Sequence, residues 1–160
     1  MTVQNLSRKN TEGCIANGLQ RQVISGLAGG TTARALLASE SGSLCMFDSA
    51  AGQIYTLPAP VIGLQFDFLV SVAGTSNSYS IDTDAATTFI GGGVAAVSTT
   101  VAEGGDSFPA TIASTVSCDL DSDVTGRLVG TALSIVCISS TEWVISGVTH
   151  GVGTLATPFA

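Results

Sequence analysis

The strictest pattern in the sequence is the alternation of residues 64–73, LQFDFLVSVA. Every second residue is a large apolar side chain, namely Leu64, Phe66, Phe68, Val70 and Val72. Successive side chains of a strand point to opposite faces, so this period of two predicts a half-buried antiparallel strand. The segments around it must then supply further strands to cover its apolar face.

Short segments with strand-like patterns continue from residue 43 to residue 149. Residues 43–48 and 53–57 flank Ser49-Ala50-Ala51-Gly52, which predicts a four-residue hairpin. Further strands are expected at 78–83, 86–90, 94–102, 110–118, 127–138 and 142–149. Strands at this spacing without helical periodicity predict an all-β fold, an antiparallel β-sandwich, with the jelly roll as the favoured form.

An uncharged stretch from Ala85 to Ala102 is long enough to raise the question of a membrane-spanning helix. Gly91, Gly92 and Gly93 interrupt it, and Thr and Ser fill much of the rest. We interpret it as strand, turn and strand. The first residues also lack the apolar run of a secretory signal, so no membrane partner is expected.

Charge is scarce in this chain, which has 160 residues. Charged residues make up 11% of it, compared with about 25% in average globular domains, while 45% of the residues are hydrophobic. Low charge with ample apolar content excludes intrinsic disorder. A soluble monomer needs more charge to cover its surface, so we expect other chains to cover part of this one.

The cations gather in the first 34 residues. Arg8, Lys9, Arg21 and Arg34 stand there against Glu12, while the remaining 126 residues carry one cation and eleven acids. We therefore divide the chain into an N-terminal arm, residues 1–36, and a β-sandwich domain, residues 37–160, with a short extended C-terminal tail. Residues 31–38, which span the end of the arm, are expected to be either a short helix or extended. Four dilute cations without aromatic residues between them argue against nucleic-acid binding.

Groups that could carry chemistry are few. Asp119, Asp121 and Asp123 alternate in one loop and could ligate Ca²⁺ with acids from a neighbouring subunit, although a solvated turn is the simpler interpretation. His150 has no adjacent acid, and the G-x-S-x-G motif of a serine nucleophile does not occur. Glu103 and Asp106 could mimic a glycosidase pair, but a turn at Glu-Gly-Gly-Asp is the simpler explanation. We expect no catalytic, metal or cofactor site, and hence no enzyme.

Four cysteines, Cys14, Cys45, Cys118 and Cys137, lack the C-x-x-C spacing of zinc or redox motifs. We expect them to be reduced and mostly buried.

One group of short motifs resembles a known family. Ser41-Gly42, Phe47-Asp48 and Thr56-Leu57-Pro58 are followed by Gly63 and Phe66-x-Phe68, and Glu142-Trp143-Val144-Ile145 comes late in the chain. Together they resemble the capsid decoration (cement) proteins of tailed phages, including cyanophage-like ones, across residues 39–149. About a dozen positions carry this likeness.

The resemblance implies a β-sandwich body, a homotrimer, and docking on the outer capsid surface of a virion assembled in the host cytoplasm. The expected partners are the major capsid protein and further copies of this chain. We assign capsid contact to the four cations of the arm, Arg8, Lys9, Arg21 and Arg34. The alternative is a fibre or baseplate module that binds a receptor or glycan, which predicts exposed aromatic side chains near Tyr55, Tyr79 or Trp143.

Overall fold

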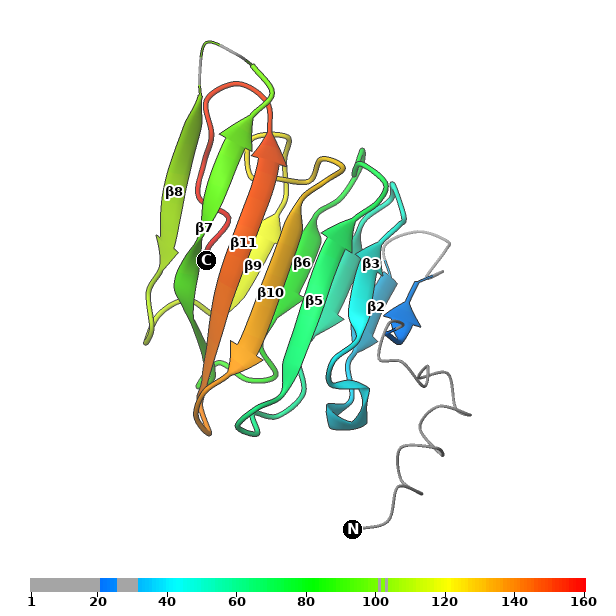
Figure 1. Cartoon of the computed structure of the whole chain (residues 1–160), viewed down its shortest axis with the longest axis vertical. Helices are drawn as coiled ribbons and strands as arrows, with labels where there is room; N and C mark the ends of the chain where they lie inside the picture. The colour runs from blue at the N-terminus through cyan, green and yellow to red at the C-terminus, as the bar shows by residue number, and fades with distance from the viewer. Residues whose placement is uncertain (1–20, 26–31, 101, 103) are drawn as a thin grey trace.

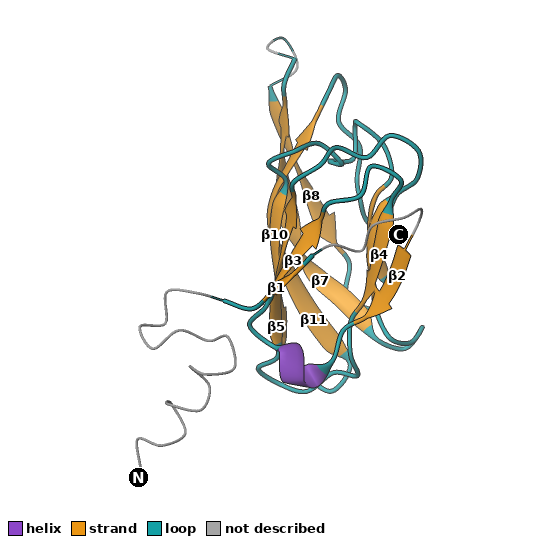
Figure 2. Ribbon diagram, turned by 90° about the vertical axis from the view of Figure 1, so that its right-hand side faces the viewer, coloured by secondary structure: helices purple, strands orange, loops and turns teal. Residues whose placement is uncertain are grey.

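The computed structural model describes residues 21–25, 32–100, 102 and 104–160. Its strands form two sheets that pack face to face, as the two edge-on layers of Figure 2 show. The larger sheet has the order β1-β3-β5-β10-β11-β7-β8, and the smaller has the order β2-β4-β6-β9 (Figure 1). The predicted all-β sandwich is therefore confirmed.

Within the described residues, the strands and one short helix have these bounds, in chain order: β1 Val23–Ile24, β2 Thr32–Ala35, the 3-10 helix η1 Ala38–Glu40, β3 Leu44–Phe47, β4 Gln53–Thr56, β5 Gln65–Val70, β6 Tyr79–Asp82, β7 Phe89–Ser98, β8 Gly105–Ala110, β9 Ser117–Leu120, β10 Ala132–Cys137 and β11 Glu142–Gly151. Among the described residues, no helix has the length and apolar character needed to cross a membrane.

Strand direction differs from the prediction. Five of the nine described strand pairings are parallel, so both sheets are mixed rather than antiparallel. The first six strands alternate between the sheets: β1, β3 and β5 pair in parallel in the larger sheet, and β2, β4 and β6 do so in the smaller. In the first half of the sandwich the chain therefore winds as a coil, passing from one sheet to the other between successive strands. The jelly roll, which needs antiparallel Greek keys, is not confirmed.

The predicted hairpin of residues 43–57 is wrong for the same reason. Its two strands, β3 and β4, belong to different sheets, and residues 48–52 carry the chain across the core. The buried amide of Gln53 holds this crossing: its oxygen accepts hydrogen bonds from the backbone N–H groups of Asp48 and Ser49 (3.1 Å for Ser49), and its nitrogen donates to Asp48 Oδ1 (2.8 Å). This turn stacks on the next one, where Thr75 N donates to Ala50 O at 2.8 Å.

Aromatic rings join the two sheets at the centre of the core. Phe47 of the larger sheet lies 4.8 Å from the ring of Tyr79 and 5.3 Å from that of Tyr55, both of the smaller sheet. All three side chains are fully buried, as is Trp143. The alternation of residues 64–73 correctly predicted the inward face of β5, since Phe66, Phe68 and Val70 all point into the core.

Two further predictions are corrected by the sheets. The glycines 91–93 do not form a turn but lie within β7, which merges the strands expected at 86–90 and 94–102. The strand expected at 110–118 is instead a turn at residues 111–114 between β8 and β9.

The arm as bounded at residue 36 is too long. β1 and β2 belong to the two sheets, residues 32–35 are extended rather than helical, and Ile24 and Leu36 are buried in the core. Residues 1–20, with Arg8, Lys9 and Cys14, and residues 26–31 lie outside the described part of the chain.

The C-terminal tail covers an edge of the smaller sheet. Asp119 N donates to Pro158 O at 2.6 Å, Val116 N donates to Ala160 O at 2.8 Å, and Cys118 and Phe159 form an antiparallel bridge. The tail therefore occupies backbone groups of β9 that would otherwise form an open edge.

Candidate functional site

The outer face of the larger sheet is apolar. Its strands alternate between buried residues and outward-facing ones, and the outward apolar residues are Leu44, Met46, Leu69, Ala95, Val97, Ala132, Val136, Val144 and Val148. The strand register aligns five of them in one row across five strands: Met46, Leu69, Ala132, Val148 and Ala95. We call these nine residues the apolar face.

Carboxylates are nearly absent from the strands that carry the apolar face. β3, β5, β10, β11 and β7 contain only Asp67 and Glu142. Asp67 forms an ion pair with Arg21, and it borders a shallow groove of about 280 Å³ between β3 and β11. A contiguous apolar surface of this kind marks an interaction site more often than ordinary solvent-exposed surface.

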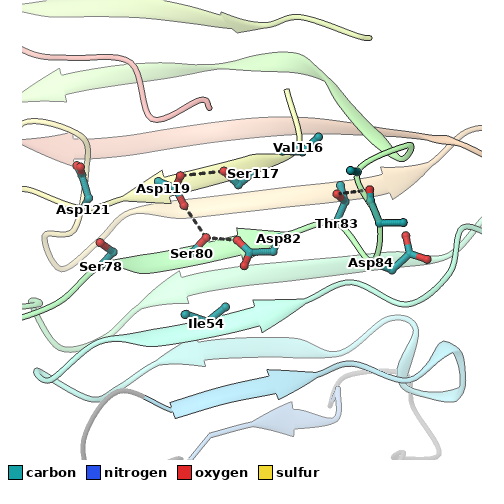
Figure 3. A pocket seen from close by; sticks show the side chains of 12 residues that line it. Ile54, Ser78, Ser80, Asp82, Thr83, Asp84, Val116, Ser117, Asp119 and Asp121 are labelled. Atoms are coloured by element: carbon teal, nitrogen blue, oxygen red, sulfur yellow. Dashed lines mark hydrogen bonds between the residues drawn. The ribbon is translucent and has the colours of Figure 1, made fainter. Parts of the chain in front are cut away.

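The outer face of the smaller sheet is acidic. A groove of about 700 Å³ runs along β6 and β9, lined by four carboxylates, Asp82, Asp84, Asp119 and Asp121, together with hydroxyl groups (Figure 3). The β6–β9 pairing places Ser80 opposite Asp119 and Asp82 opposite Ser117, so side chains distant in sequence share this face. We call it the acidic groove.

One hydroxyl group links two carboxylates in the acidic groove. Ser80 Oγ contacts Asp82 Oδ1 and lies 2.6 Å from Asp119 Oδ1, while Ser117 Oγ donates to Asp119 Oδ2 at 2.8 Å (Figure 3). Because a serine hydroxyl has one proton to donate, it satisfies only one of the two carboxylates at a time. Burial raises the pKa of Asp82, the hydrogen bond from Ser80 opposes that rise, and the nearby charge of Asp119 adds to it.

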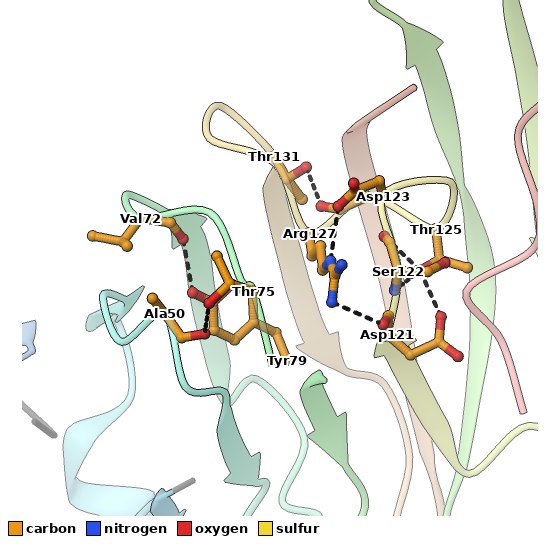
Figure 4. Close-up of polar contacts among 11 residues, drawn as sticks. Ala50, Val72, Thr75, Tyr79, Asp121, Ser122, Asp123, Thr125, Arg127 and Thr131 are labelled. Carbon is orange, nitrogen blue, oxygen red and sulfur yellow. Dashed lines mark hydrogen bonds and ion pairs between the residues drawn. The ribbon is translucent and has the colours of Figure 1, made fainter. Parts of the chain in front are cut away.

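The three alternating aspartates of the 119–123 loop do not share one site. Asp119 and Asp121 both line the acidic groove. Asp121 Oδ1 accepts a hydrogen bond from Thr125 Oγ1 at 2.8 Å, whereas Asp123 Oδ1 pairs with Arg127 Nε at 2.8 Å (Figure 4). Arg127 also donates to the Asp121 backbone carbonyl at 3.4 Å. In the part of the chain that the structure describes, no three His, Cys, Asp or Glu side chains form a metal-binding group.

Two of the four cations predicted to contact a capsid have partners within the chain. Arg21 donates to the carbonyls of Gly42 (3.0 Å) and Ser43 (3.4 Å) and pairs with Asp67. Arg34 pairs with the buried carboxylate of Glu40, whose other oxygen accepts a hydrogen bond from Leu37 N at 2.9 Å. Both arginines thus hold the sandwich together, whereas Arg8 and Lys9 lie outside the described residues.

The remaining candidates lie apart from one another. The backbone N–H of His150 donates to Thr131 Oγ1 at 2.8 Å. Asp106 is exposed on β8, and Glu103 lies outside the described residues. Tyr55, Tyr79 and Trp143 have no exposed surface. These three rings therefore do not supply the exposed aromatic side chains that the fibre or baseplate alternative predicts near them.

Three cysteines are free and buried, as expected. Burial raises the pKa of Cys45 to about 12, and it also raises the pKa values of Cys118 and Cys137. A thiol acts as a nucleophile only as its thiolate, so these three groups are unreactive in the folded chain.

Sequence reasoning missed both outer faces. The apolar face had a signal, since β10 (ALSIVC) and β11 (EWVISGVTHG) place Val136, Val144 and Val148 between buried residues. The acidic groove had only a partial signal, since Asp119 and Asp121 alternate in one loop but meet Asp82 only because β6 and β9 pair.

Comparison with known proteins gives no relative for this chain: no family model, no curated protein and no solved structure matches it.

Proposed function

We propose that this protein is a structural virion protein that decorates and stabilises the outer surface of an icosahedral phage capsid as a homotrimer. The observation that carries the proposal is the apolar face, a broad surface of nine outward apolar residues on the larger sheet. Such a surface favours contact with other protein chains over binding of a small substrate. The motif resemblance to tailed-phage cement proteins is the reason for proposing that the chain is part of a virion.

The scarcity of charge supports extensive subunit contact. Interface cores are depleted of charged residues, and the strands under the apolar face contain two carboxylates, one of which Arg21 already neutralises. The major capsid protein and sister subunits are the proposed partners. Because Arg21 and Arg34 are engaged within the chain, we now assign capsid contact in the arm to Arg8 and Lys9.

The decisive experiment is to purify filled heads and count the copies of this protein. A number close to that of the major capsid protein supports decoration, and a few copies per particle favour a fibre or baseplate component. A charge-reversed variant, Arg8→Glu with Lys9→Glu, tests the arm. It should fold and assemble normally but lose most of its occupancy on heads, and full occupancy would refute the role of these two cations.

The second candidate is a fibre or baseplate module that binds a receptor or glycan. The acidic groove favours it, because carboxylates and serine hydroxyls can hydrogen-bond to sugar hydroxyls. This candidate predicts binding on a glycan array that Asp119→Asn weakens. Absence of binding by the wild-type protein would exclude it for the glycans tested.

A further inference from the structure

The apolar face has no covering element among the described residues, although the chain enters the sandwich beside it. Val23 of β1 stands opposite Leu44, which stands opposite Asp67. Val23 is 53% exposed, on the same side as Leu44 and Asp67. The edge strand β1 therefore presents the preceding residues to the border of the apolar face.

Arg21 fixes the direction of that entry. Its guanidinium donates to the carbonyls of Gly42 and Ser43, which directly precede β3, and pairs with Asp67 of β5 at the edge of the shallow groove. Three contacts of the Arg21 side chain thus attach the first described residue of the chain at one border of the apolar face. We propose that, before assembly, residues 1–20 of the chain lie across the apolar face of the same molecule.

The segment is long enough for this position. Twenty extended residues span up to about 66 Å, whereas the seven strands of the larger sheet cover about 29 Å from first to last at a spacing of about 4.8 Å. The segment contains Val3, Leu6, Ile15 and Leu19, which are apolar groups for the groove. A crossing of the whole face therefore uses less than half of the available chain.

Charge favours the chain's own segment over a second copy. Residues 1–20 carry two cations and one acid, a net charge of +1. The rest of the chain therefore carries a net charge of −8, which gives −7 for the whole chain. A second copy brings the same negative charge to the encounter, whereas the segment is weakly positive and already tethered. Tethering also supplies a high effective concentration without any new contact. On assembly, a partner that binds the apolar face would displace the segment.

Disulfide trapping in the free, full-length protein tests this inference. Cys14 lies in the segment, and the other three native thiols are buried. Ser134→Cys places a second thiol in the shallow groove of the apolar face, and Ser146→Cys provides an independent reporter on the neighbouring strand. Ser78→Cys, which lies in the acidic groove on the opposite sheet, is the matched control.

Under mild oxidation we expect an intrachain disulfide with Cys14 in the two face variants, at least fivefold more than in the control, identified by mass spectrometry. A Cys14→Ser background should abolish it. Equal trapping in all three variants or no trapping in either face variant would overturn the inference. Predominant interchain dimers would overturn it in favour of a second copy. The inference does not rest on the proposed function, and its test requires no capsid.

Discussion

Gly92 allows two strands of the larger sheet to approach closely, and replacing it with alanine should destabilise the sheet. Gly92 has φ +95°, and a Cβ atom placed there would lie 2.2 Å from the backbone oxygen of Ile145 on the parallel neighbour β11 and 3.1 Å from Val144 Cγ1. Ordinary carbon–oxygen contacts begin near about 3.3 Å. The two strands must therefore separate by about 1 Å at this point.

The cost has two parts. A β-carbon in the left-handed region costs about 1–2 kcal/mol, of which the reduced freedom of the unfolded chain offsets about 0.4–1 kcal/mol. Separating the strands sacrifices about two ladder hydrogen bonds at about 0.5–1.5 kcal/mol each. We therefore expect Gly92→Ala to lower the free energy of unfolding by about 3 kcal/mol.

Gly63 provides the matched control. Its φ is +90°, nearly that of Gly92, but no atom lies within 4 Å of the position where its Cβ would stand. Gly63→Ala therefore retains the backbone term and lacks the strand clash, so its cost should be about 1 kcal/mol.

Thermal unfolding at one fixed protein concentration measures both variants. For a chain of this size, 1 kcal/mol corresponds to about 2–4 °C, so Tm should fall by about 6–12 °C for Gly92→Ala and by about 2–4 °C for Gly63→Ala. Equal shifts would refute the reasoning, because they would place residues 91–93 in an open turn rather than inside β7.

Three further predictions concern buried or partly buried polar groups. Tyr79→Phe should lower the free energy of unfolding by about 1–2 kcal/mol in a urea titration, because the carbonyls of Ser49 and Val72, which share the one hydroxyl proton of Tyr79, lose their donor (2.8 and 2.7 Å; Figure 4 shows the Val72 contact); an unchanged midpoint would contradict this hydrogen bonding. The raised pKa of Asp82 means that the folded state binds its proton more tightly than the unfolded state, so this carboxyl reduces stability as pH rises above the unfolded pKa of about 3.8 and through the higher folded value. Asp82→Asn should therefore gain stability relative to wild type between pH 4 and pH 7, and a difference that does not vary with pH would refute this. At pH 8, no more than one of the four thiols should react with Ellman's reagent in the native protein and all four after unfolding; rapid native reaction of more than one would show that the buried cysteines are accessible.

Local pattern predicted the strands better than their partners. Residues 43–48, 53–57, 64–73 and 78–83 contain β3, β4, β5 and β6 within their bounds. Alternation shows which side chains point inward, but it does not show to which sheet a strand belongs. The four residues 49–52 suit a hairpin and a crossing equally well, and the choice depends on whether Phe47 and Tyr55 lie side by side or face each other across the core.

Strand pairing also determines which of the candidate site residues lie together. Asp119 was recognisable as one of three alternating acids, but Asp82 lies 37 positions earlier and joins it only because β6 and β9 are neighbours. Arg21 and Arg34 were recognisable as cations of a basic head, but their partners were not. The parallel pairing of β1, β3 and β5 brings Asp67 to Arg21, and the 3-10 helix η1 places Glu40 beside Arg34 six residues earlier. Charge counted along a sequence therefore overstates the charge available to a partner.

The two outer faces impose different requirements on any partner. Four carboxylates line the acidic groove of the smaller sheet, so a macromolecule that binds there must bring cations or hydrogen-bond donors to offset their desolvation. The apolar face of the larger sheet requires neither, because its one central carboxylate, Asp67, is already paired with Arg21. A partner gains apolar burial on that face at about 25 cal/mol per Å² without separating an ion pair. Since the C-terminal tail occupies the β9 edge of the smaller sheet, the larger sheet is the surface on which this chain can be covered at the lowest electrostatic cost.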